Sequence, residues 1–298
     1  MLELPVIEKS IFYSVLMVYL LAALVGFLQL SGADKYRRIM ISLIAFGVSL
    51  ESVILVFRAA AIKAVPLTGL FESMIVLTVV FGLTCLFLSI VIRQVWFSSV
   101  MSWIIFVMAV LSVMVARPAS QLQIVARTPW VVAHGFSMAL SGAMISFATA
   151  MAALFLLGRW RLKHKQISKV IGRIPNIEKL EHLNMFALTM CFILMTFGLV
   201  SGIGMAVLKA ETLNISVYDW VTDSKIIIIA AAWILVAVIL TLRHTIALKG
   251  KSIARMTMLA FFLVLFAIVG SSILCKSSHD FSVGEEQKTV ELRDYETR

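Results

Sequence analysis

The stretch Thr128-Pro-Trp-Val-Val-Ala-His134-Gly-Phe-Ser-Met138 opens an apolar run that continues to Leu157. At about 1.5 Å of rise per residue, a helix of this length crosses the ~30 Å hydrocarbon core of a membrane. His134 is the only histidine well inside a long apolar run. A neutral imidazole at that depth can ligate a metal or carry a proton, and the alternative is a histidine that only forms a hydrogen bond between helices.

The composition of the whole chain is that of a membrane protein, because 61% of its 298 residues are hydrophobic and only 14% are charged. We therefore predict an all-α, polytopic membrane helical bundle, and no cleavable signal is expected before its first helix. Apolar runs long enough to cross the membrane recur eight times, at 11–31, 39–61, 71–93, 97–116, 130–158, 184–208, 225–247 and 254–275. Residues 1–275 form one predicted domain, and residues 276–298 a charged tail.

The distribution of the basic residues predicts the topology. Alternate connections, counted from the one after the first run, hold fifteen Lys and Arg residues, whereas the intervening short loops hold six. By the positive-inside rule the first set is cytoplasmic, so both termini lie on the outer side. The net charge of +10 indicates contact with the lipid bilayer and no nucleic-acid partner, because these cations are gathered into particular loops and the topology accounts for them.

The second predicted helix carries two ionisable residues, Glu51 and Arg58, seven positions apart. This spacing places them on one face, and a carboxylate at such depth must meet a partner or a polar cavity. The functional interpretation is a contact with a proton or with a cofactor edge, and the structural one is a hydrogen bond between helices. A small-molecule transporter built on this pair is a further hypothesis, although inverted repeats and broken helices are not visible.

Several segments between Arg58 and Phe281 resemble, in order, the CcsA/ResC-type cytochrome c biogenesis proteins. The most specific are the histidine region and the Asp-x-Lys motif. The segments are Arg58 to Glu72, Trp130-x-x-x-His134-x-x-x-Met138-x-x-Ser141, Pro175 to Leu180 with Gly198 and Gly202, Asp223-Ser-Lys225, and His279-Asp-Phe281.

The resemblance implies that the protein binds haem near its outer face. In that family two outer-side histidines are axial ligands of haem iron, which here implies His134 and His279 as ligands of a non-covalently bound haem b. The loop before the seventh run corresponds to the family's tryptophan-rich haem platform and contains Trp220 and Asp223. Glu72 is a further predicted cofactor-binding residue, with helix capping as its alternative.

Two arginines and one more histidine complete the predicted site residues. Arg117 and Arg127, in an outer loop, can pair with carboxylates such as haem propionates, and the alternative is that they are solvated. The family commonly has a membrane histidine near the end of the seventh helix, where this chain has Thr241. His244 lies three residues further on and is predicted as an inner metal ligand.

The resemblance implies a protein of the bacterial plasma membrane that presents haem for covalent attachment to c-type cytochromes. The predicted partners are a ResB/CcsB-type membrane protein and an apocytochrome c with a CxxCH motif. At most, the chain is the haem-presenting subunit of a cytochrome c synthase. Ser216 and Thr222 stand where two platform tryptophans are expected. The alternative is therefore a non-catalytic, HemX-like binding or regulatory membrane protein.

Overall fold

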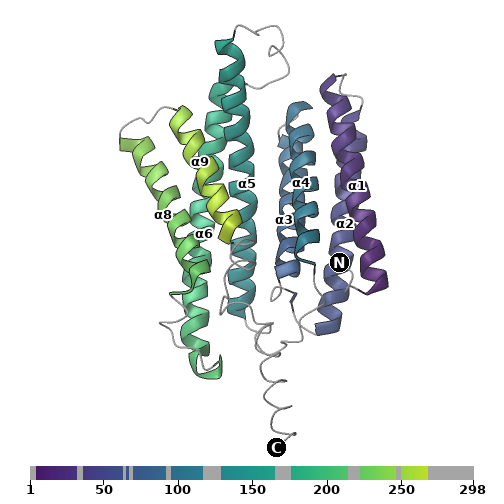
Figure 1. The fold of residues 1–298 in the computed structure, drawn as a ribbon, viewed down its shortest axis with the longest axis vertical. Helices are drawn as coiled ribbons and strands as arrows, with labels where there is room; N and C mark the ends of the chain where they lie inside the picture. Colours follow the sequence, from purple (N-terminus) through teal and green to yellow (C-terminus); the bar gives the residue numbers. More distant parts are fainter. Residues whose placement is uncertain are drawn as a thin grey trace, which may run out of the picture.

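In the computed structural model the chain is an all-α bundle, which confirms the predicted fold class (Figure 1). The structure describes residues 5–31, 36–62, 65–66, 70–91, 95–116, 129–164, 176–213, 222–245 and 250–267. Within these ranges there is no strand, and the helices are α1 (Val6–Ser31), α2 (Arg37–Ile62), α3 (Leu70–Val91), α4 (Val95–Met114), α5 (Pro129–Lys163), α6 (Ile177–Leu213), α8 (Ser224–Thr245) and α9 (Gly250–Leu265).

The surface of the bundle suits a lipid environment. Seven helices of the described part, α1 to α6 and α8, are long and apolar enough to cross a membrane. Large apolar side chains such as Phe87, Phe197 and Val56 are mostly exposed on their outward faces, where water would disfavour them. The chain is a multi-pass integral membrane protein. The eighth predicted span is described only in its first part, by α9, and the predicted position of the termini stays a prediction.

Several helices extend beyond the predicted spans. The helix α6 begins at Ile177 rather than 184, because the Oδ1 atom of Asn176 accepts a hydrogen bond from the backbone N–H of Glu178 and caps the helix. The helix α5 continues to Lys163, five residues past the expected end. Hydropathy marks the part of a helix that lies in hydrocarbon, whereas these added turns are polar.

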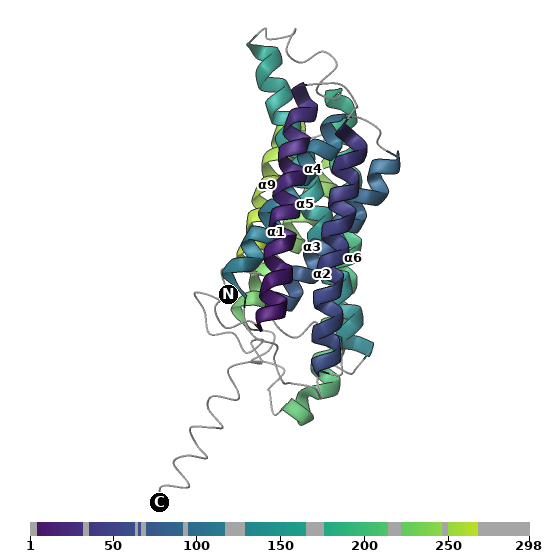
Figure 2. The ribbon, with the colours of Figure 1, turned by 90° about the vertical axis from the view of Figure 1, so that its right-hand side faces the viewer.

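The helices form two groups that run alternately between two ends (Figures 1 and 2). Helices α1 to α4 form one group, and α5, α6, α8 and α9 form the other. We call the end at which α1 ends and α2 begins the upper end, as in Figure 1, and the end at which α5 begins the lower end. The upper end is the one predicted to be cytoplasmic, and the lower end the one predicted to be outer.

Close packing holds the two groups together. The main contact between them joins α3 to α5, and within the second group α5 packs most extensively against α6. Gly142 of α5 permits the first contact, because a Cβ atom there would lie 2.9 Å from a methyl group of Leu77 of α3. The rings of Phe97 in α4 and Phe147 in α5 also meet edge to face, with centroids 5.9 Å apart.

Candidate functional site

His134 lies five residues into α5, at the lower end, where its side chain is partly buried against α6. Its Nδ1 atom is 2.7 Å from the carbonyl oxygen of Gly198. A carbonyl oxygen can only accept a hydrogen bond, so Nδ1 must carry the proton. In the neutral ring the Nε2 lone pair is then left available to bind a metal ion or a proton.

The approach of α6 to His134 depends on small residues. A Cβ atom at Gly198 would lie only 2.5 Å from Sδ of Met138, four residues after His134. One turn beyond Gly198, Ser201 donates a hydrogen bond of 3.0 Å to the same carbonyl oxygen. The Gly198 carbonyl is therefore a fixed acceptor that holds the imidazole in one orientation.

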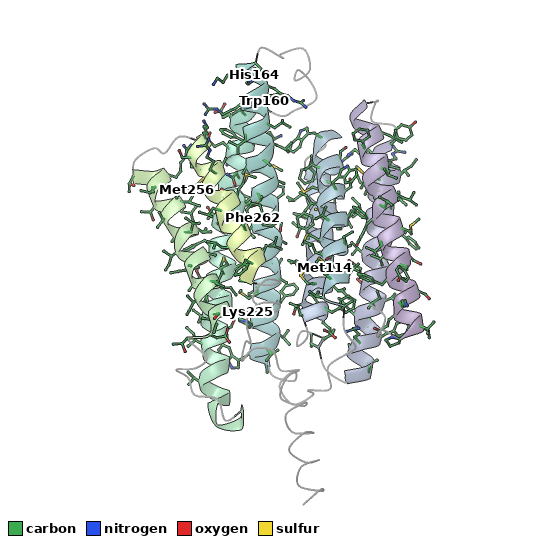
Figure 3. The ribbon with its side chains drawn as sticks, viewed as in Figure 1. Met114, Trp160, His164, Lys225, Met256 and Phe262 are labelled. Carbon is green, nitrogen blue, oxygen red and sulfur yellow. The ribbon has the colours of Figure 1, made fainter. Side chains whose placement is uncertain are left out.

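The Asp223-Ser-Lys225 motif forms the start of α8, also at the lower end. The Oδ1 atom of Asp223 accepts a hydrogen bond of 2.8 Å from the backbone N–H of Lys225, so Asp223 caps the helix. The positive charge of Lys225, labelled near the lower end in Figure 3, lies close enough to His134 to act on its ring. The starts of α5 and α8, which are far apart in the sequence, thus lie at the same end of the bundle.

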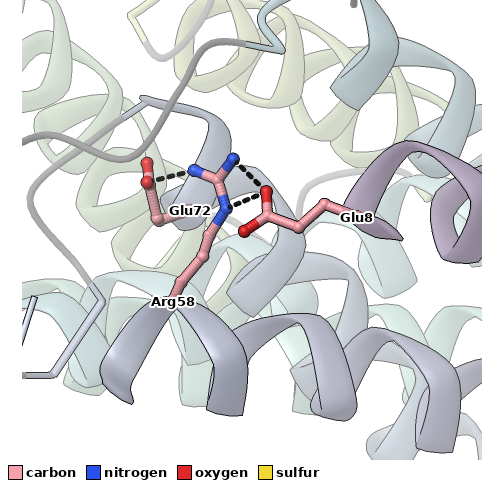
Figure 4. Close-up of polar contacts among 3 residues, drawn as sticks. All are labelled: Glu8, Arg58 and Glu72. Carbon is pink, nitrogen blue, oxygen red and sulfur yellow. Dashed lines mark hydrogen bonds and ion pairs between the residues drawn. The ribbon is translucent and has the colours of Figure 1, made fainter. Parts of the chain in front are cut away.

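Glu72, at the start of α3, lies in a buried ion-pair cluster (Figure 4). Arg58 of α2 is fully buried and pairs with both Glu72 and Glu8 of α1, the latter at 2.9 Å. The guanidinium also lies over the ring of Phe71, 4.6 Å from its centroid. These contacts tie three helices together at the lower end, and we call Glu8, Arg58 and Glu72 the Arg58 cluster.

Glu51 meets a different partner from Arg58. The hydroxyl group of Tyr19 in α1 donates a buried hydrogen bond of 2.9 Å to Oε2 of Glu51. The Tyr19 ring lies against Gly47, where a Cβ atom would be 2.2 Å from it. Of the two interpretations of Glu51, the structure supports the hydrogen bond between helices.

Four predicted site residues lie outside the described residues, namely Arg117, Arg127, Trp220 and His279. The backbone of His244 lies in the last turn of α8, at the upper end, and its ligand role stays a prediction. The described part therefore places His134, the Asp223 segment and Glu72 at the same end of the bundle. Within it, no group of three or more His, Cys, Asp or Glu side chains is placed to hold a metal ion.

The partners of these residues were not predicted from the sequence. Gly198 was named only as part of a segment that resembles the family, and neither Tyr19 nor Glu8 was assigned a role. The spacing of α1 carries the signal for both, because Glu8, Phe12, Val15 and Tyr19 recur every three or four residues on its buried face. No sequence pattern marks a backbone carbonyl as the partner of a histidine.

The fold and the described site define a multi-pass helical membrane protein with an oriented imidazole at one end. Residues 67–279 match the family of cytochrome C assembly proteins, so the chain belongs to that family. No curated protein matches the chain. Membership confirms the predicted family and gives the protein a role in the maturation of c-type cytochromes, with haem handling and with apocytochrome and membrane partners.

Proposed function

We propose that this protein holds haem b, non-covalently, at the lower end of the bundle between His134 and His279. From there it presents the haem for attachment to an apocytochrome c with a CxxCH motif, together with a ResB/CcsB-type membrane partner. The observation that supports this most directly is the hydrogen bond from Nδ1 of His134 to the Gly198 carbonyl.

The imidazole fits the task of an axial ligand. Histidines that bind metals generally donate the other ring N–H to a carbonyl or carboxylate group, which fixes the tautomer and the ring plane. His134 has this arrangement, and it lies near the end of a membrane helix rather than in the middle. Imidazole nitrogen is a suitable ligand for haem iron, and the bound haem would supply the porphyrin to which the cytochrome thiols form thioethers.

The surrounding residues have distinct proposed roles. The Lys225 charge beside His134 favours an anionic ligand, which suits the propionate groups of haem. We assign the same role to Arg117 and Arg127, because a guanidinium pairs with a carboxylate in a planar fork. Trp220 would offer an apolar indole surface to the porphyrin.

Two further predicted cofactor-binding residues support the site through the helices that they hold. Asp223 caps the start of α8 and so positions Lys225. Glu72 fixes the start of α3 through Arg58. In this proposal both act on haem binding through the position of a helix end.

The proposal is tested by the absorption spectrum of the protein purified from membranes. We expect about one low-spin haem per chain in the wild type and a loss of low-spin haem in His134→Ala and His279→Ala. His134→Asn is the matched variant, because its amide N–H can still donate to the Gly198 carbonyl while no nitrogen replaces Nε2. It should fold like the wild type and still lose the haem. A wild type without stoichiometric haem, or histidine variants with unchanged spectra, would show that the proposal is wrong.

A second candidate function is a HemX-like binding or regulatory role without haem delivery. Ser216 and Thr222, in place of two platform tryptophans, favour it, because a hydroxyl side chain offers no flat apolar surface to a porphyrin. The two functions differ in cells that lack their own synthase. Restored covalent haem attachment to a CxxCH reporter cytochrome on coexpression with a ResB-type partner supports delivery, whereas haem binding without restoration supports the HemX-like role.

A further inference from the structure

Helices α1, α2 and α4 meet closely near the upper end of the bundle, far from His134. The contact centres on Gly26 of α1. A Cβ atom there would lie 2.6 Å from Oγ of Ser102 in α4 and 3.2 Å from Sδ of Met40 in α2. The backbones of α1 and α4 thus lie close together, and the Met40 side chain of α2 packs against them.

One helical turn nearer the upper end, each of these helices presents a polar side chain. Three or four residues correspond to about 4.5–6 Å along a helix, which leads from Gly26 to Gln29, from Met40 to Arg37, and from Ser102 to Ser98. Gln29 is 0% exposed and Ser98 is 1% exposed. We call Gln29, Arg37 and Ser98 the Gln29 layer.

The Gln29 layer holds most of the unsatisfied polar atoms of the described residues. Among all the described residues, five buried side-chain nitrogen or oxygen atoms have no hydrogen-bond partner. Four of the five belong to the Gln29 layer, namely Nε2 and Oε1 of Gln29, Nε of Arg37 and Oγ of Ser98. Leaving such an atom unpaired is unfavourable, because it loses its hydrogen bonds to water on burial and gains none in return. Four at one level, from three helices, indicate a ligand that supplies the missing hydrogen bonds.

The electrostatics of this layer favour an anion. Arg37 directs one guanidinium nitrogen to the Ser89 carbonyl at the end of α3, and no carboxylate pairs with it among the described residues. The helices α2 and α4 both begin here, at Arg37 and Val95, so the positive ends of two helix dipoles add to its charge. A water molecule would satisfy Gln29 and Ser98 but would leave the guanidinium without a counter-charge from the described residues.

We propose that the Gln29 layer binds the phosphate group of an anionic phospholipid from the adjacent leaflet. Guanidinium, amide and hydroxyl groups are all donors to phosphate oxygens. The layer lies about one turn inside the ends of membrane-spanning helices, close to the level of lipid headgroups. The Oε1 atom of Gln29 can accept a hydrogen bond from a headgroup hydroxyl such as that of phosphatidylglycerol.

The test compares lipid binding by the wild type with Arg37→Gln, Gln29→Leu and Ser98→Ala, and uses Arg38→Gln as the matched control. Arg38 is the neighbouring arginine in the sequence and is exposed. After delipidation in detergent, native mass spectrometry measures the binding of added phosphatidylglycerol. We expect about one tightly bound lipid per wild-type chain, and binding at least ~10-fold weaker in the Arg37 and Gln29 variants, or ~1.4 kcal/mol. The control should bind as the wild type does.

Three other outcomes would overturn the proposal. Equal binding of phosphatidylcholine, or an equal loss in the Arg38 control, would show only general attraction to the surface and would overturn the proposal. If inorganic phosphate raises the melting temperature of the delipidated protein and phosphatidylglycerol does not, the site takes a free anion and the lipid assignment is wrong. Binding of neither ligand also overturns it. Melting temperature and haem content confirm folding, and Gln29→Leu and Ser98→Ala keep the test valid if Arg37→Gln does not fold.

Discussion

The Nδ1 atom of His134 and the carbonyl oxygen of Gly198 are 2.7 Å apart, and they join the two most extensively packed helices of the bundle. This contact relates the orientation of one imidazole to the spacing between α5 and α6. The spacing is set in turn by Met138, which lies against Gly198.

We predict that Gly198→Ala lowers the affinity for haem several-fold. The added methyl group would lie 2.5 Å from Sδ of Met138, so either the methionine moves or α6 is displaced and the His134 hydrogen bond lengthens. Overpacking of this kind costs about 1–3 kcal/mol. Haem titration of the purified protein measures the effect. The double variant Gly198→Ala, Met138→Ala should recover most of the affinity, and failure of this rescue would separate the haem site from the packing of these helices.

Substitutions at Asp223 separate a structural role from a direct role in haem binding. Asp223→Ala removes the cap of α8 and should destabilise the protein by about 0.5–2 kcal/mol, whereas Asp223→Asn keeps an acceptor oxygen for the Lys225 N–H. We expect Asp223→Asn to retain both the melting temperature and the haem content of the wild type. If it melts normally and still loses haem, the carboxylate charge itself contacts the cofactor.

Removal of the cation from the Arg58 cluster should be strongly destabilising. Arg58→Met leaves Glu8 and Glu72 without this counter-charge, and breaking a buried pair costs about 3–5 kcal/mol. Thermal unfolding in detergent measures the loss. The triple variant Arg58→Met, Glu8→Gln, Glu72→Gln removes all three charges and should be more stable than Arg58→Met alone. The opposite order would mean that the carboxylates have other cationic partners.

The hydrogen bond between Tyr19 and Glu51 depends on the close packing of the Tyr19 ring against Gly47. Gly47→Ala places a methyl group 2.2 Å from the Tyr19 ring, so the ring and its hydroxyl group must leave Glu51. We expect a destabilisation of at least ~1–3 kcal/mol from overpacking, together with the loss of a buried hydrogen bond. Tyr19→Phe loses the hydrogen bond alone and should be the milder variant in thermal unfolding. Equal melting temperatures for the two variants would contradict the close packing.

The positions of seven of the eight predicted membrane helices could be predicted from hydropathy, because burial in hydrocarbon requires about 20 apolar residues whatever their order. The helix ends could not, since Asn176 and Asp223 cap their helices through hydrogen bonds that hydropathy does not register. The extra turns at the start of α6 are the result of the first of these caps.

The candidate site could be predicted only in part. His134 was recognisable because an isolated polar ring in an apolar run is rare, and the structure gives its orientation. The carboxylate partners of Arg58 were not recognisable, because they lie 50 and 14 residues away on other helices. The helical periodicity that placed Glu51 and Arg58 on one face was insufficient to tell their partners apart.

The Arg58 cluster also bears on how the chain enters the membrane during synthesis. Glu8 and Arg58 belong to α1 and α2, which precede the family match at residue 67, whereas Glu72 lies within the match. A lone arginine in hydrocarbon is costly, but Glu8 has already emerged when Arg58 is made. The first two helices can therefore insert with Arg58 already paired to Glu8, before Glu72 is synthesised. They then offer the incoming α3 a preformed cationic contact that fixes where it docks.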